Sequence, residues 1–126
     1  MTTSLSDMAQ PAQLRKRLLD YAVGLPEARV DHPWGEDVAK VRGKIFAFFG
    51  TADGDEPGMG VKLPESNALA LSQPGVTPTG YGLGKAGWVS MRLTDEMPFE
   101  MLRDWIDESY RAVAPKKLGA SLQRRS

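Results

Sequence analysis

The chain has 126 residues, the size of one domain, and 41% of them are hydrophobic, which is enough for a small core. It contains no cysteine, which excludes disulfides, thiolate nucleophiles and cysteine-bound zinc. The 16 basic and 16 acidic residues give a net charge of zero, whereas nucleic-acid-binding proteins typically have a basic balance. The longest apolar run, Ile45–Phe49, is too short to cross a membrane, and the first residues show no secretory signal pattern. We therefore expect a cytoplasmic protein with no membrane contact.

The first half of the chain predicts a helix followed by three strands. We expect a flexible leader at residues 1–9, one domain at 10–118 and a basic tail at 119–126. Proline suits the first position of a helix, where its missing N–H has no partner in any case. A helix is therefore predicted from Pro11 to about Val23. Three strands follow at Val38–Arg42, Lys44–Phe49 and Met59–Leu63, the first two joined by a tight hairpin at Gly43.

The second half predicts two helices separated by an irregular segment and a strand. Apolar residues at three- and four-residue spacing make the last helix the clearest element of the chain. The order α-β-β-β-α-β-α predicts an α+β fold, with helices packed on one face of an antiparallel sheet. These elements are a short helix at Asn67–Ser72, an irregular crossing at Gln73–Gly87, a strand at Trp88–Leu93 and a helix from Pro98 to about Ala114.

Alternation along the predicted strands divides the sheet into an apolar face and a basic, aromatic face. The apolar face is expected against the helices. The other face is expected to collect five cations, three aromatic rings and no acid, from Lys40, Arg42, Lys44, Phe46, Phe48, Lys62, Trp88, Ser90 and Arg92. Cations that meet phosphates and rings that stack on bases are typical of a platform for single-stranded nucleic acid. The alternative is that lysine and arginine stems cover apolar rings on the solvated side, or that the C-terminal segment folds over them.

A glycine-rich turn, Gly80–Gly87, presents one lysine, Lys85, directly before the strand that opens with Trp88. Gly82–Gly87 matches the pattern G-x-G-x-x-G. A dinucleotide site requires a strand before this pattern and a helix after it, and here the order is a loop and then a strand. The remaining interpretations are an anion-binding turn of backbone N–H groups and a simple wide turn.

His32 is the only histidine of the chain. Together with Trp34 and Tyr81 it is a candidate for a small-anion pocket, between the His32 loop and the Gly80–Trp88 turn. Its acidic neighbours are more typical of a solvated loop than of a metal site. No spacing supports a catalytic triad and no nucleophile elbow is present. We therefore expect no catalytic residue, no metal and no cofactor.

Between Leu14 and Leu118 the chain carries a series of short motifs: Leu25-Pro26, Pro33-Trp34-Gly35, Gly43-Lys44-Ile45-Phe46, Val61-Lys62-Leu63-Pro64, Gly80-Tyr81, Lys85 with Trp88, Ser109-Tyr110 and Lys116-Lys117-Leu118. In their order and spacing these motifs resemble the MmcQ/YjbR family. The family commonly has Asn and His where this chain has Gly84 and Gly87, so no role of those side chains carries over. The resemblance implies a compact α+β fold similar to that of frataxin/CyaY, also described as a double wing, and the description "DNA-binding protein". Iron binding of the frataxin kind uses an acidic first helix, whereas this one carries Arg15, Lys16 and Arg17.

The leading hypothesis from the sequence is a monomeric, non-enzymatic binding module for DNA or RNA. Phosphates would be met by cations and a base would stack on Trp88. Two rival hypotheses remain, a small-anion-binding protein and a protein-interaction adaptor. The cations proposed to meet phosphates are Lys40, Arg42, Lys62, Lys85 and Arg92.

Overall fold

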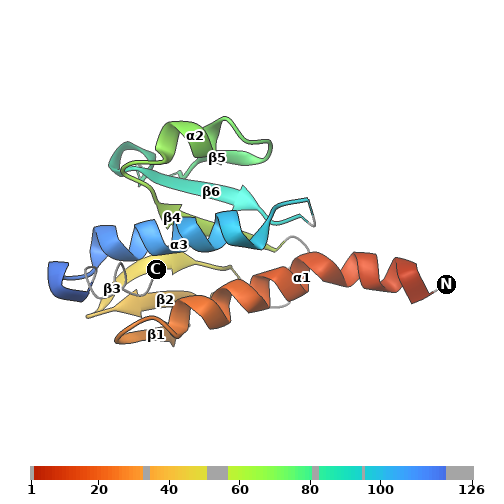
Figure 1. Ribbon diagram of the computed structural model, residues 1–126, viewed down its shortest axis with the longest axis horizontal. Coiled ribbons are helices and arrows are strands. Elements are labelled where there is room, and N and C mark those ends of the chain that lie inside the picture. Colours follow the sequence, from red (N-terminus) through yellow and green to blue (C-terminus); the bar gives the residue numbers. More distant parts are fainter. Residues whose placement is uncertain (1, 33–34, 51–56, 81–82, 95, 119–126) are drawn as a thin grey trace.

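The computed structural model describes residues 2–32, 35–50, 57–80, 83–94 and 96–118 (Figure 1). The predicted α+β class is confirmed. The helices are α1 (Thr2–Val23), α2 (Asn67–Leu71), the 3-10 helix η2 (Leu83–Ala86) and α3 (Phe99–Val113). The strands are β1 (Ala28–Asp31), β2 (Val38–Val41), β3 (Lys44–Phe48), β4 (Gly58–Lys62), β5 (Val76–Pro78) and β6 (Trp88–Arg92).

The six strands form one antiparallel sheet in the order β1-β2-β3-β4-β6-β5. Helices α1 and α3 lie against one face, with α3 across the middle strands and α1 toward β1 and β2 (Figure 1). The short helix α2 contacts β5 and β6 at the other end of the sheet. No helix in the described part of the chain is both long and apolar enough to cross a membrane.

The first helix begins at Thr2, nine positions before the predicted start at Pro11. Residues 2–9, expected as a flexible leader, are therefore helical. A proline inside a helix removes one hydrogen bond and crowds the preceding turn, but it does not always end the helix. Residues 2–10 contain no glycine or second proline that would stop it.

Two of the six strands, β1 and β5, were not expected from the sequence. β1 does alternate apolar and polar residues from Ala28 to Asp31, but its four residues are at the lower limit of length at which alternation indicates a strand, and β5 has only three residues. In β1, three of the four residues are exposed, and Pro78 ends β5. Both strands lie at the edges of the sheet, where burial imposes little pattern on the sequence.

The tight hairpin predicted at Gly43 is confirmed. Val41 pairs with Lys44, so Arg42 and Gly43 form a two-residue turn. Both have positive φ, 52° and 80°, as a type I′ turn requires. The aspartate, asparagine or glycine usual at the first position is replaced here by arginine, which is less suited to this conformation.

Helix α3 fixes three other segments of the chain through consecutive residues near its C-terminal end. Both carboxylate oxygens of Glu108 accept hydrogen bonds from the segment before α2, including those from Ser66 N at 2.9 Å and Ser66 Oγ at 2.6 Å. Ser109 Oγ accepts a bond from the Lys62 amide and donates one to the Phe46 carbonyl. Tyr110 donates its hydroxyl to the Pro26 carbonyl at 2.6 Å. These bonds satisfy polar groups that would otherwise be costly to bury.

Candidate functional site

The outer face of the sheet, opposite the helices, is defined by the strand register. Lys62 pairs with Trp88 and Gly58 with Arg92, which places these side chains on one face. Arg29 pairs with Lys40 across β1 and β2, on the same face. Four cations, Arg29, Lys40, Lys62 and Arg92, therefore share this face with one acid from the described residues, Asp31.

Phe46 does not lie on the outer face, and the prediction that it does is wrong. The register between β2 and β3 shifts at Ala39/Lys40, so that Lys40 pairs with Ile45 and Ala39 with Ala47. Phe46 is the extra residue of this bulge and it enters the core, where its ring meets that of Tyr110 edge to face at 5.3 Å. A bulge breaks strict alternation, because it lets two consecutive residues point to the same side. The bulge also takes Lys44, which pairs with Val41, out of the predicted outer set.

Trp88 lies on the outer face as predicted, but it offers little surface for a stacking base. Only 8% of the residue is exposed, because its indole packs on Phe48 at a centroid distance of 5.2 Å and 66° between the planes. Phe48 is on β3 and Trp88 is on β6, and β4 lies between these two strands. Gly60 of β4 pairs with Phe48. A large, edge-packed aromatic of this kind stabilises the sheet.

Two of the predicted phosphate-binding cations are held by acids from the segment before β2. Lys40 donates to Asp31 at 2.7 Å, and this bond is the main cause that lowers the pKa of Asp31. Arg42 makes two hydrogen bonds to Glu27, and the lowered pKa of Glu27 has the same kind of cause. Asp31 belongs to β1, the edge strand that was not expected from the sequence. The predicted face without acids is therefore partly neutralised.

The described residues of the predicted pocket between the His32 loop and the Gly80–Trp88 turn do not come together. His32 follows β1 at one edge of the sheet, whereas Lys85 lies in η2, which contacts β6 and β5 at the other edge. From β1 to β6 there are four strand spacings, about 19 Å at the usual distance between strands. Trp34 and Tyr81, the other two residues of this prediction, lie outside the described residues.

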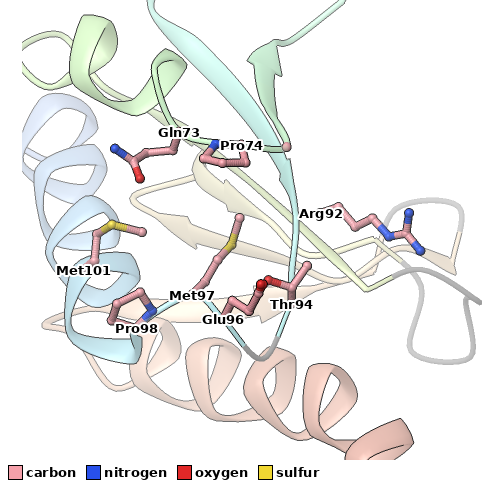
Figure 2. Close-up of a pocket in the computed structure, with 9 residues that line it drawn as sticks. Gln73, Pro74, Arg92, Thr94, Glu96, Met97, Pro98 and Met101 are labelled. Carbon is pink, nitrogen blue, oxygen red and sulfur yellow. The ribbon is translucent and has the colours of Figure 1, made fainter.

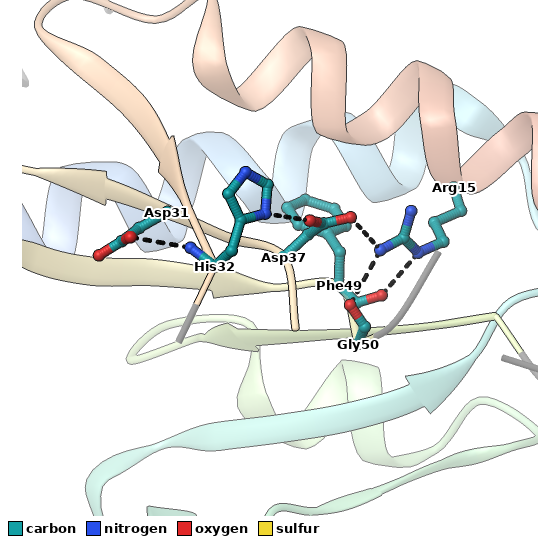
Figure 3. Close-up of polar contacts among 6 residues, drawn as sticks. All are labelled: Arg15, Asp31, His32, Asp37, Phe49 and Gly50. Carbon is teal, nitrogen blue, oxygen red and sulfur yellow. Dashed lines mark hydrogen bonds and ion pairs between the residues drawn. The ribbon is translucent and has the colours of Figure 1, made fainter. Parts of the chain in front are cut away.

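A buried arginine joins α1 to the end of β3 and to the histidine loop (Figure 3). Arg15 donates to the carbonyls of Phe49 at 2.7 Å and Gly50 at 2.9 Å, and to Asp37 Oδ2 at 2.6 Å. The other oxygen of Asp37 lies 2.6 Å from His32 Nδ1. The hydrogen bond from Arg15 is the largest cause that lowers the pKa of Asp37 below its ordinary value.

This Arg15–Asp37–His32 cluster resembles a catalytic dyad at first sight, because a carboxylate orients an exposed imidazole. Among the described residues, however, the His32 imidazole has a hydrogen bond only to Asp37. Asp37 also closes the start of the β2–β3 ladder, since its amide bonds to Gly50 and its carbonyl to Phe49. The cluster is therefore explained by its role in fixing α1 on the sheet.

No group of three or more metal-ligating side chains occurs within the described ranges.

A cavity of about 420 Å³ opens between the start of α3, the end of β6 and the segment before β5 (Figure 2). Its walls are mainly apolar, with two methionines and two prolines, Met97, Met101, Pro74 and Pro98. Ligand sites commonly have this size and an apolar lining with a few polar groups. No local pattern in the sequence indicates this cavity, because its walls come from segments distant in the chain.

The polar groups of the cavity are unevenly charged. Gln73, Thr94 and Glu96 contribute an amide, a hydroxyl and a carboxylate to its lining. Arg92 also borders it, but Figure 2 shows its guanidinium extending away from the methionines. Arg92 and Glu96 are the two charged residues among the described lining of the cavity. Since Arg92 points away, the charge beside the apolar walls is the negative charge of Glu96.

Comparisons with known proteins agree with the observed fold. The sequence model of the YjbR family matches residues 23–112. The uncharacterized protein YbdF of Escherichia coli O157:H7 is 32% identical over 96 residues, which cover 73% of this chain and 77% of that protein. The crystal structure of Deinococcus radiodurans DR2400, with a DUF419 domain, has a TM-score of 0.68 and 26% identity over 82% of this chain and 80% of that one. A Pseudomonas syringae protein has the same fold, with a TM-score of 0.62 and 22% identity over 79% of this chain and 97% of that one. The chain belongs to the YjbR family.

Proposed function

We propose that this protein is a non-enzymatic binding module that takes a small, largely apolar molecule in the cavity beside α3. The observation that carries the proposal is the concave apolar surface of Met97, Met101, Pro74 and Pro98, about 420 Å³ in volume. An apolar cavity with a few convergent polar groups is the usual form of a small-molecule site.

The polar groups favour a ligand that carries an amine or another strong hydrogen-bond donor. Glu96 contributes a carboxylate, and Thr94 and the Gln73 amide carry oxygens that accept hydrogen bonds. An anion, as in the sequence-based rival hypothesis, would meet the charge of Glu96 at close range. A small aryl-alkyl amine fits the apolar walls and this charge together.

Binding can be tested by NMR of protein labelled at the methionine methyl groups. An aryl-alkyl amine should shift the signals of Met97 and Met101 and leave that of Met59, a buried residue of β4, unchanged. Glu96→Gln should weaken the amine about tenfold, as the loss of a charge-assisted contact predicts. Glu100→Gln, which changes an exposed carboxylate of α3 outside the cavity lining, is the matched control. An uncharged or carboxylate analogue that binds as well as the amine would reject the assigned ligand class, and no methionine shift at millimolar amine would reject the site.

A second candidate function, binding of single-stranded DNA or RNA, is favoured by the charge of the outer face. Four cations against one acid leave three net positive charges among the described residues of that face. Single-strand binding that uses three phosphate contacts, one for each net positive charge, should show a slope of log K against log salt of about −2. Lys85 lies in η2 rather than in the sheet, and Arg42 is held in the turn by Glu27, so neither is part of this candidate surface.

Fluorescence anisotropy of a labelled oligonucleotide over a salt series tests this second candidate. Replacing two outer-face cations, Lys62→Glu with Arg92→Glu, should abolish binding, because it changes the face by four charges. The control Lys116→Glu with Lys117→Glu makes the same change of four charges after α3 and should change affinity little. Equal loss in the variant and the control would indicate only a nonspecific effect of total charge and would reject the face.

A further inference from the structure

The two edges of the sheet differ in how far they are open to another strand. Strand β5, at one edge, has three residues, ends in Pro78, which has no N–H, and is contacted by α2 and η2. Strand β1, at the opposite edge, has four residues, and three of them are exposed (Figure 1). An open edge of this kind presents unpaired N–H and C=O groups to a further strand.

The hydrogen bonds around β2 indicate which main-chain groups of β1 face outward. The amide and carbonyl of Asp37 bond on the β3 side, to Gly50 and Phe49. Because these directions alternate along a strand, those of Val38 and Lys40 point to β1. Their partners in the register are Asp31 and Arg29. The N–H and C=O of Val30, between these two residues, therefore point away from β2 and toward the open edge.

The side chains of β1 are complementary to a second copy of the same strand. Arg29 and Asp31 lie on the outer face, and the Arg29 guanidinium makes no ion pair with another described residue. Val30 lies on the opposite face and is 40% exposed, one of three large hydrophobic residues exposed in the described ranges. In an antiparallel pair centred on Val30, each Arg29 lies across from Asp31 of the other copy and the two valines lie together. Opposite charges and β-branched residues directly across from each other stabilise strand pairs.

We propose that β1 pairs with β1 of a second copy and joins two six-stranded sheets into a reversible dimer. This departs from the monomer expected from the sequence. The charges also select the register, since a shift by two residues in either direction places Arg29 against Arg29 or Asp31 against Asp31. The pairing is weak, because four-residue strands bury far less than a standard interface and the charges remain exposed.

A single cysteine at the centre of the pairing provides a direct test, since the natural chain has none. Hydrogen-bonded residues across antiparallel strands have Cα atoms about 5.5 Å apart, within the range that a disulfide spans. Val30→Cys should form a disulfide-linked dimer under mild oxidation at least about tenfold faster than the control Thr77→Cys, which places an exposed thiol on β5. Equal rates for the two variants would overturn the proposal.

A charge exchange tests the register independently of the cysteine. Arg29→Asp puts two acids on β1 and Asp31→Arg puts two cations there, so each variant alone should associate about tenfold more weakly than the natural chain. A 1:1 mixture should recover association, because each acid of one chain then faces a cation of the other. Sedimentation velocity from 10 µM to 1 mM measures this, with circular dichroism to confirm that both variants fold and Lys44→Asp as a control off this edge. A mixture that associates no better than its two components would also overturn the proposal.

Discussion

Replacing Arg15 by methionine should destabilise the fold by about 3 kcal/mol. The change keeps an apolar stem but removes the bonds to Asp37, Phe49 and Gly50. Leaving one partner of a buried ion pair alone costs about 3–5 kcal/mol. We expect the lower end of this range, because 13% of the Asp37 side chain is exposed and His32 still contacts it.

The effect of this substitution should depend on pH in a defined direction. Arg15 lowers the pKa of Asp37 in the folded protein, whereas the unfolded chain keeps a value of about 3.9. The carboxylate therefore adds stability that is fully present at neutral pH and is lost as pH falls through the folded pKa. Without Arg15, burial instead disfavours the charged carboxylate. The difference in stability between the natural chain and Arg15→Met should thus narrow as pH falls below about 5.

Urea unfolding followed by tryptophan fluorescence between pH 7 and pH 3 measures both quantities, since Trp88 and Trp105 are buried. The matched control is Lys16→Met on the same helix, whose pair with Asp20 is exposed and should be worth less than about 0.5 kcal/mol. A loss below about 1 kcal/mol for Arg15→Met, or a difference that does not change with pH, would refute this account of the cluster.

Three further substitutions give distinct expected outcomes. Gly87→Ala should cost about 1–3 kcal/mol in urea unfolding because Gly87 has a φ of 97°, whereas Gly80→Ala meets nothing within 4 Å and should be nearly neutral. Desolvation raises the pKa of Asp107, so Asp107→Asn should be neutral or slightly stabilising at pH 7 and should flatten the pH dependence of stability between pH 4 and 6. The amide oxygen of the new asparagine can still accept the hydrogen bond from the Tyr21 hydroxyl. A clear loss of stability of Asp107→Asn at pH 7 would contradict desolvation as the cause of the raised pKa. Ser109→Ala should cost about 1–3 kcal/mol in thermal unfolding because two backbone groups lose their partner, and a change below about 0.5 kcal/mol would contradict that role.

The elements that the sequence predicted best are those in which a local pattern and the final packing agree. In α3, apolar residues at helical spacing, among them Leu102 and Ile106, are fully buried in the structure. The two-residue turn was predicted from Gly43, whose positive φ suits a glycine. Family resemblance extended these local signals to the whole fold.

The outer face was predicted only in part, because its composition depends on register and on very short strands. The bulge at Phe46 changes which side chains share a face, and a binary sequence pattern contains no signal for it. Asp31 neutralises Lys40 from a strand of four residues that is mostly exposed. The cavity at Met97 and Met101 depends on a segment some twenty residues earlier in the chain, so no single window of sequence predicts it.

The three anchors near the end of α3 have a consequence for the order of events during biosynthesis. Glu108, Ser109 and Tyr110 hold the segment before α2, the middle strands and the turn before β1, respectively. A ribosome adds about 5–20 residues per second, so all three connections wait until the last part of the domain has left the exit tunnel. Until then the apolar side of the middle strands has no α3 to cover it. We therefore expect the apolar side of the nascent sheet to stay exposed for several seconds before the domain closes.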